Sequence, residues 1–150
     1  MRRFTVLHVD DDPNDAFFVR RAFSKANLGV DLHHVPDGTR AVAYLRGEGV
    51  YADRLRFPLP SLVLLDIKLP IMDGFEILSW LRQHEQLRGL TVFILSSSDQ
   101  LQDRNRAQEL GADLFFVKSP TFTEVIDKVS CLLAENPDLA RQPALGPTNL

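Results

Sequence analysis

The chain has 150 residues, 45% of them hydrophobic, so it is long enough to form one domain with a substantial core. A formal net charge of −3, with no long basic run, argues against a nucleic-acid-binding protein. The single cysteine excludes an internal disulfide, no apolar run is long enough to span a membrane, and Met1–Arg3 does not open a signal peptide. We therefore expect a cytoplasmic protein in which Cys131 is a small buried residue.

Five short apolar runs alternate along the chain with longer segments of helical periodicity. The strands are expected at 4–9, 31–35, 61–66, 91–96 and 113–117. The helices are expected at 13–27, 37–46, 73–85, 99–110 and 120–134. This alternation predicts an α/β fold of parallel strands, with right-handed crossovers and helices on both faces of one sheet.

Several residues mark the ends of these segments. Asp12, followed by Pro13, is a typical start of a helix, and Asp73 is expected to cap the third helix. Ser98 and Asp99 are the cap candidates for the fourth helix. The glycines and prolines of 47–60 predict an exposed loop. Prolines also break the pattern after the last helix, so we expect a domain over 1–135 and an extended or disordered tail over 136–150.

Three consecutive acids, Asp10, Asp11 and Asp12, follow the first predicted strand. Helix capping accounts for Asp12, because an acid there accepts hydrogen bonds from free backbone amides and complements the helix dipole. It does not account for Asp10 and Asp11, which would repel each other unless a cation neutralised them. Mg²⁺ prefers one or two carboxylates together with water and phosphate oxygens, so this pair is a candidate magnesium site.

Single polar residues close three other predicted strands: Asp66, Ser96 and Lys118. Each has an ordinary structural alternative, since Asp66 could belong to a turn, Ser96 to a polar loop and Lys118 to a solvated surface. In doubly wound sheets, however, the carboxyl ends of the strands line the crevice where ligands bind. A carboxylate nucleophile can accept a phosphoryl group as an acyl phosphate, and a hydroxyl and an ammonium can contact its oxygens. The four histidines show no metal-ligand spacing and are expected in strands or at a helix end.

Taken together, these motifs resemble the receiver domain of two-component response regulators over about residues 4–133. The segments that carry the resemblance are Val9–Pro13, Leu64–Pro70 followed by Asp73-Gly74, Leu95–Ser98, and Gly111–Asp113 leading to Lys118. More narrowly, Tyr51–Arg54, Pro58–Pro60 and Ser79–Arg82 resemble the stand-alone regulators that pair with bacterial and cyanobacterial phytochromes.

The resemblance implies a flavodoxin-like (βα)5 receiver fold with a parallel sheet in the order 2-1-3-4-5. It also implies phosphorylation on Asp66. Mg²⁺ would be coordinated directly by Asp11, Asp66 and the backbone carbonyl of Lys68, and through water by Asp10.

Two further roles come from the same resemblance. Ser96 and Lys118 would contact the phosphoryl group, and Phe115 would be the aromatic switch that moves inward when Ser96 is drawn to the phosphate. One departure from the family pattern is Ser119, which stands where a proline usually follows the lysine. This departure affects the expected geometry of switching more than phosphorylation itself.

We therefore expect a response regulator without enzyme activity of its own, which takes a phosphoryl group from a phytochrome-type sensor histidine kinase and signals through protein contacts. The expected homodimer face is formed by 99–110, 113–117 and 120–134. One alternative is a pseudo-receiver that works as an interaction module without phosphorylation. Another is a phosphohydrolase with an aspartate nucleophile, but such an enzyme needs a second acid two residues later, where this chain has Lys68.

Overall fold

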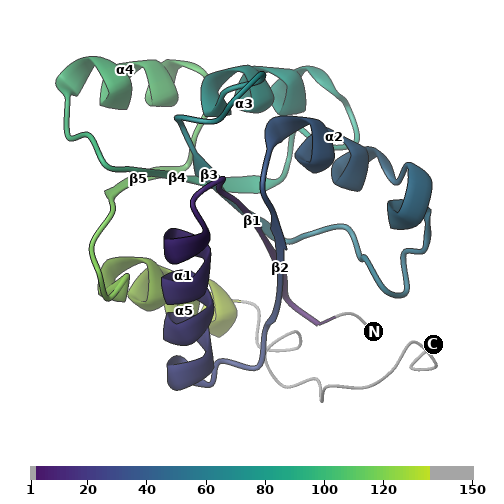
Figure 1. Ribbon diagram of the computed structural model, residues 1–150, viewed down its shortest axis with the longest axis horizontal. Helices are drawn as coiled ribbons and strands as arrows, with labels where there is room; N and C mark the ends of the chain where they lie inside the picture. The colour runs from purple at the N-terminus through teal and green to yellow at the C-terminus, as the bar shows by residue number, and fades with distance from the viewer. Residues whose placement is uncertain (1–2, 136–150) are drawn as a thin grey trace.

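Five parallel strands form a single sheet in the order β2-β1-β3-β4-β5, which confirms the predicted doubly wound α/β fold (Figure 1). The computed structural model describes residues 3–135. The strands are β1 (Thr5–Val9), β2 (Asp31–Val35), β3 (Leu62–Asp66), β4 (Thr91–Ser96) and β5 (Leu114–Val117). The helices are α1 (Pro13–Ala26), α2 (Gly38–Arg46), α3 (Gly74–Gln83), α4 (Leu101–Glu109) and α5 (Thr123–Glu135). The tail predicted for 136–150 lies outside the described residues.

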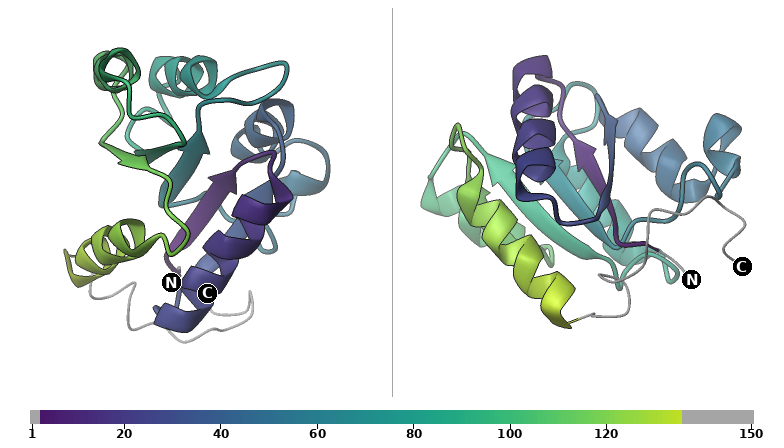
Figure 2. Two further views of the ribbon diagram at one scale, coloured as in Figure 1. Left: turned by 60° about the vertical axis from the view of Figure 1, so that its left-hand side comes forward. Right: turned by 90° about the horizontal axis from the view of Figure 1, so that it is seen from below.

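The helices divide into two layers around the sheet. Helices α2, α3 and α4 cover one face, and α1 and α5 lie beside each other across the other (Figures 1 and 2). Two clusters of buried apolar side chains fill the space between the sheet and these layers. Within β3, all five residues are buried, as expected for a central parallel strand that is covered on both faces.

Three aspartates cap helices, and the sequence predicts two of them, Asp12 and Asp73. The side chain of Asp12 accepts a hydrogen bond from the Asn14 amide at 2.8 Å. Asp37 and Asp73 do the same for α2 and α3, at 2.8 and 2.9 Å. An N-cap of this kind stabilises a helix by about 1 kcal/mol, because it satisfies one of the free amides of the first turn.

The starts of the last two helices differ from the predicted ones. Helix α4 begins at Leu101 behind Gln100, which makes no side-chain cap, so neither Ser98 nor Asp99 caps it. Ser98 instead accepts a hydrogen bond from the Gln100 amide in the preceding turn, and Asp99 pairs with Arg104 at 2.7 Å. Helix α5 begins at Thr123 rather than at residue 120.

The prediction that Cys131 is buried is wrong, because its side chain is exposed. The helical stripe around it is correct: Phe122, Val125, Val129 and Leu133 are all buried. Cys131 lies outside this stripe, two residues after Val129. No helix within residues 3–135 has the length and apolar character needed to cross a membrane.

The prediction of an exposed loop over 47–60 is also wrong in part. A 3-10 helix, η1, spans Gly49–Ala52, and Tyr51 and Phe57 pack against the core. Arg54 donates hydrogen bonds to the carbonyls of Tyr44 and Leu45, at 2.7 and 2.9 Å, and so satisfies the end of α2. This segment folds back on α2 because tertiary contacts outweigh its glycines and prolines.

Candidate functional site

Polar side chains from different strands meet at the carboxyl edge of the sheet. Asp10 directly follows β1, Asp66 ends β3, Ser96 ends β4 and Lys118 directly follows β5. Asp10, Asp66 and Ser96 are buried, with relative exposures of 1%, 6% and 1%. Burying ionisable groups is costly unless they are paired, so their convergence needs a compensating charge.

Lys118 supplies that charge. Its ammonium lies 3.0 Å from Asp10 Oδ2 and 3.2 Å from Asp66 Oδ2. It also lies 2.8 Å from Asp15 Oδ2, which projects from the first turn of α1. The predicted meeting of Lys118 with the acids is therefore present, with Asp15 as an additional partner.

Asp10, Asp11 and Asp66 form a cluster suited to a cation. One carboxylate oxygen from each lies within 4.8 Å of the others, so the three could hold one metal ion. Both oxygens of Asp10 already have protein partners, the Asp12 amide and Lys118, whereas Asp11 is exposed. The Lys68 amide lies 3.4 Å from Asp66 Oδ1, which places its peptide beside the cluster. An all-oxygen donor set of this kind fits a hard divalent cation.

The two buried acids of the pair have opposite pKa shifts. Burial alone would raise the pKa of Asp10, but the nearby His8 ring, the Asp12 amide and the charge of Lys118 together lower it to about 2. Burial raises the pKa of Asp66 to about 6, with the negative charge of Asp10 adding to the rise and the Lys118 charge opposing it. Asp66 is thus the more basic carboxylate of the two.

Ser96 and Phe115 reach the same side of the sheet, but at different depths. Alternation along β4 and β5 puts Ser96, Ile94 and Phe115 on the face that α4 covers. Ser96 Oγ accepts a hydrogen bond from the Ser98 amide at 3.0 Å. Phe115 is half-buried, and the guanidinium of Arg104 lies 4.8 Å from its ring centroid. The Lys118–Ser119 peptide is trans, as are all peptide bonds in the described residues.

Two residues near the acids were not predicted as part of the site. Asp15 could have been found, because a helix that starts at Pro13 puts residue 15 in its first turn at the same edge. His8 could also have been found, because it precedes Asp10 by two residues and so shares its face of β1. Its ring is 1% exposed, Nε2 lies 3.5 Å from Asp10 Oδ2, and burial lowers its pKa, which favours the neutral ring.

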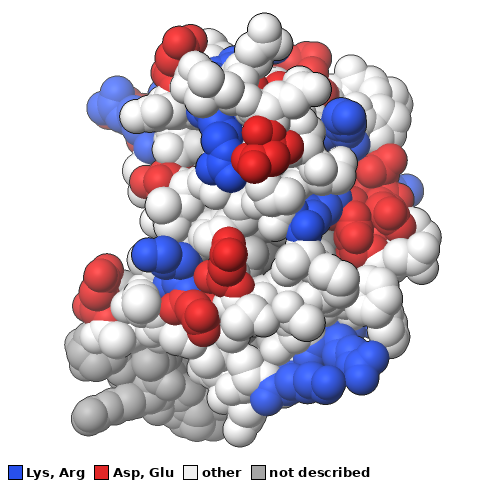
Figure 3. Space-filling model, turned by 90° about the vertical axis from the view of Figure 1, so that its left-hand side faces the viewer, with Lys and Arg blue, Asp and Glu red and all other residues white. Residues whose placement is uncertain are grey.

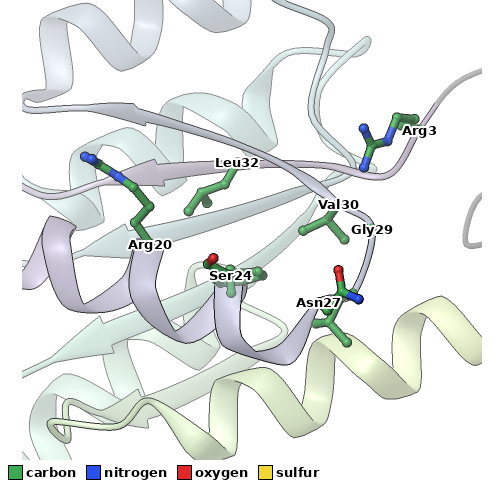
Figure 4. Close-up of a pocket in the computed structure, with 9 residues that line it drawn as sticks. Arg3, Arg20, Ser24, Asn27, Gly29, Val30 and Leu32 are labelled. Atoms are coloured by element: carbon green, nitrogen blue, oxygen red, sulfur yellow. The ribbon is translucent and has the colours of Figure 1, made fainter. Parts of the chain in front are cut away.

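A separate hollow of about 300 Å³ lies at the other end of α1, between this helix and β2 (Figure 4). Its polar lining includes Arg3, Arg20, Ser24 and Asn27. It opens near the start of β2, whereas the acids lie at the carboxyl ends of the strands. It is therefore not part of the acid pocket.

A parallel 2-1-3-4-5 sheet with acids and a lysine gathered beside β1 and β3 is the architecture of a receiver domain. The chain belongs to the response regulator receiver domain family, whose model matches residues 6–130. This confirms the family resemblance seen in the sequence. Receiver domains are signalling modules rather than classical enzymes.

The chain is similar to several response regulators of known structure. The response regulator RPA3017 in red light signaling of R. palustris has 30% sequence identity and a TM-score of 0.78, with 95% of this chain and 99% of that chain covered. The bacteriophytochrome response regulator AtBRR has 34% identity and a TM-score of 0.76, with 97% and 98% covered. The Mn(2+)-bound form of response regulator Rcp1, a Synechocystis protein, has 27% identity and a TM-score of 0.74, with 94% and 99% covered.

Proposed function

We propose that this protein is a response regulator that accepts a phosphoryl group on Asp66 from a sensor histidine kinase. The observation that carries the proposal is the position of Lys118, whose ammonium lies 3.2 Å from Asp66 and 3.0 Å from Asp10 inside an acid cluster. Phosphoryl transfer depends mainly on positioning and on positive charge near the phosphoryl oxygens, and both are supplied here.

The proposed step makes one bond and breaks one. An Asp66 oxygen attacks phosphorus, and the phosphorus–nitrogen bond of a phosphohistidine breaks, so that the imidazole leaves with the electron pair and takes up a proton. Lys118 would neutralise phosphoryl oxygens from one side, and the Ser96 hydroxyl would donate to another. Asp11, Asp66 and the Lys68 carbonyl would hold Mg²⁺ directly and Asp10 through water. When bound, the ion supplies charge neutralisation for the phosphoryl oxygens and for the crowded carboxylates.

The basicity of Asp66 supports this assignment. A pKa of about 6 leaves Asp66 mostly ionised at neutral pH, while the carboxylate stays a better nucleophile than Asp10. Asp10 is already engaged by the Asp12 amide and by Lys118, so it is the weaker choice of acceptor.

The proposed kinase is of the phytochrome type. Support comes from the similarity to AtBRR, a bacteriophytochrome response regulator, and to RPA3017, a response regulator in red light signaling. This chain covers nearly the whole length of both regulators.

Phosphotransfer in vitro tests the proposal. Wild type and Asp66→Asn are incubated in parallel with phosphorylated candidate kinases and Mg²⁺, and intact mass is measured. We expect a gain of one phosphoryl group on wild type only, fastest with a phytochrome-type kinase. If wild type stays unmodified both with kinases and with a small phosphodonor, the protein is instead a phosphorylation-independent interaction module.

We also propose a homodimer through the face formed by α4, β5 and α5. Leu101 at the start of α4 is 69% exposed and Leu114 at the start of β5 is 38% exposed. Figure 3 shows the side of the molecule on which α4, β5 and α5 lie, where positive and negative side chains are interspersed with uncharged surface, which suits self-association. Analytical ultracentrifugation at micromolar concentration, with and without beryllofluoride, would contradict the dimer if only monomer sedimented in both conditions.

A further inference from the structure

Asp15 makes the shortest of the three contacts of Lys118, yet none of the roles described so far uses it. Its carboxylate lies 2.8 Å from the ammonium, against 3.0 Å for Asp10 and 3.2 Å for Asp66. Its side chain is 24% exposed, so the contact is partly shielded from water. An acid in the first turn also complements the helix dipole, which is a purely structural role. The contact with Lys118 distinguishes it from an ordinary first-turn acid.

The three acids around Lys118 do not contact its ammonium in the same way. Two of its N–H donors make hydrogen bonds, to Asp10 and to Asp15, while Asp66 is in ion-pair contact at the longest distance. Asp10 and Asp15 come from different elements, the end of β1 and the start of α1. Together they hold the ammonium between them and beside Asp66.

We propose that Asp15 is a positioning residue for phosphoryl transfer, which keeps Lys118 beside Asp66 with one N–H available to the incoming phosphoryl group. This inference rests on the proposed function of Asp66. Without Asp15, only Asp10 and Asp66 would remain as partners, and the N–H that Asp15 releases would turn to Asp66, because Asp10 already accepts a hydrogen bond from the ammonium. The ion pair would then occupy the attacking oxygen and withhold the positive charge from the phosphoryl oxygens.

The first test compares Asp15→Asn with Asp12→Asn. Both changes remove one negative charge near the acid pocket, and Asn still caps α1 at position 12, but the structure shows no contact between Asp12 and Lys118 within the described residues. With phosphoramidate and saturating Mg²⁺, we expect Asp15→Asn to slow phosphorylation by about tenfold and Asp12→Asn to change it by less than about twofold. Asp15→Glu, which keeps the carboxylate, should recover most of the loss.

The second test is a double-mutant cycle with Lys118→Ala. If Asp15 acts through Lys118, Asp15→Asn should slow phosphorylation by about tenfold in the wild-type background. In the Lys118→Ala background it should change the phosphorylation rate by less than about twofold. The same cycle is measured on beryllofluoride affinity by NMR titration, which needs no turnover. Equal effects in the two backgrounds, or equal effects of Asp15→Asn and Asp12→Asn, would overturn the proposal.

The result that would contradict phosphorylation of Asp66 differs from the one that would contradict the role of Asp15. If wild type and Asp66→Asn behave alike and neither gains a phosphoryl group, Asp66 is not the acceptor. If wild type reacts while Asp15→Asn reacts equally fast, only the inference about Asp15 is wrong.

Discussion

Asp66 shows how neighbouring charges give two carboxylates in one pocket different chemistry. Asp10 and Asp66 share Lys118, and both are buried, but only Asp10 gains the Asp12 amide and the adjacent His8. The pKa of Asp10 therefore falls to about 2, while burial and the charge of Asp10 leave that of Asp66 at about 6. A cation bound between the acids would bring the pKa of Asp66 back down towards its ordinary value, because its positive charge favours the ionised carboxylate.

At the residue scale, the sequence could predict most of the acid pocket, because Asp10, Asp11, Asp66 and Lys118 each lie at the end of a strand or within two residues after it. It could not predict which acid holds Lys118 most closely, since that depends on how α1 sits on the sheet. The contact of Ser96 with a phosphoryl group was argued from its place at the end of a strand, whereas the role of Phe115 came from the family resemblance alone. The structure places both at the expected edge and face, and their part in switching stays a prediction.

Ile71 carries a backbone strain that can be measured. Its φ is 69°, in the left-handed region, and its side chain is 91% exposed, so no burial offsets the strain. For a non-glycine residue this conformation costs about 1–2 kcal/mol. We expect Ile71→Gly to raise the free energy of unfolding by about 1 kcal/mol in urea titrations.

Val50→Gly is the matched control for Ile71→Gly. Val50 is also β-branched and 71% exposed, but it lies in η1 without a positive φ. Glycine there should lower the free energy of unfolding by about 0.5–1 kcal/mol. A loss of stability in both variants would show that Ile71 is not strained.

At the element scale, the junction between β3 and α3 is set by a close approach at Gly74. A Cβ at this position would lie 2.8 Å from Ile67 Cα and even nearer the carbonyl oxygen of Asp66. The Gly74 amide also donates to the Ile67 carbonyl at 2.8 Å. Gly74→Ala must therefore push α3 away from the end of β3, where Asp66 lies.

We expect Gly74→Ala to lower the free energy of unfolding by about 3 kcal/mol and to slow phosphorylation of Asp66 as well. Gly89→Ala is the control, because a Cβ there meets nothing within 4 Å and its φ is not positive. Its effect should stay within about 0.5 kcal/mol. Urea titration and phosphoramidate labelling measure the two quantities, and a Gly74→Ala variant as stable as Gly89→Ala would contradict the predicted clash.

Arg54 links η1 to α2 and gives a second prediction at this scale. Its guanidinium binds the Tyr44 and Leu45 carbonyls and also the Phe57 carbonyl at 3.2 Å. We expect Arg54→Ala to lower the free energy of unfolding by about 2 kcal/mol, because three acceptors lose a charged donor. Arg40→Ala, in α2 itself and with a side chain 61% exposed, should change the free energy of unfolding by less than about 0.5 kcal/mol. Thermal and urea unfolding compare the two, and equal losses would rule out the capping role.

Local chemistry decided which of these elements could be predicted. Asp12 and Asp73 cap helices through contacts within three residues, so the sequence alone was sufficient. The segment 47–60 differs from the prediction because Arg54 and Phe57 are ordered by α2 and the core, which lie outside the segment. The start of α4 was misjudged because Ser98 and Asp99 make their hydrogen bonds within the turn and along the helix surface.

At the scale of the whole molecule, Lys118 connects the ends of three separate segments. It follows β5 and contacts Asp10 after β1, Asp15 in α1 and Asp66 in β3. The 2-1-3-4-5 order is what brings these residues together, since it places β1 and β3 side by side at the centre of the sheet. The alternation of strands and helices predicted a parallel sheet, whereas the strand order was supplied by the family resemblance.

The stability of the whole fold should depend on the charge of Asp66. Because its pKa rises from 3.8 in the unfolded chain to about 6 in the folded one, ionisation of Asp66 weakens the fold. The loss begins as the pH rises above 3.8 and is complete above 6. We expect Asp66→Asn to raise the free energy of unfolding by on the order of 2 kcal/mol at pH 7.5, and by almost nothing at pH 4.

Urea titrations at both pH values in EDTA measure this difference, with Asp127→Asn on the exposed surface of α5 as the control for removing a carboxylate outside the pocket. Adding Mg²⁺ at pH 7.5 should stabilise wild type more than Asp66→Asn. The ion binds the acid cluster of the folded protein, and the variant offers it one carboxylate fewer. A gain from Asp66→Asn that is the same at pH 4 and pH 7.5 would mean that packing, and not the buried charge, limits stability at this site. An equal effect of Mg²⁺ on both proteins would place the ion away from Asp66.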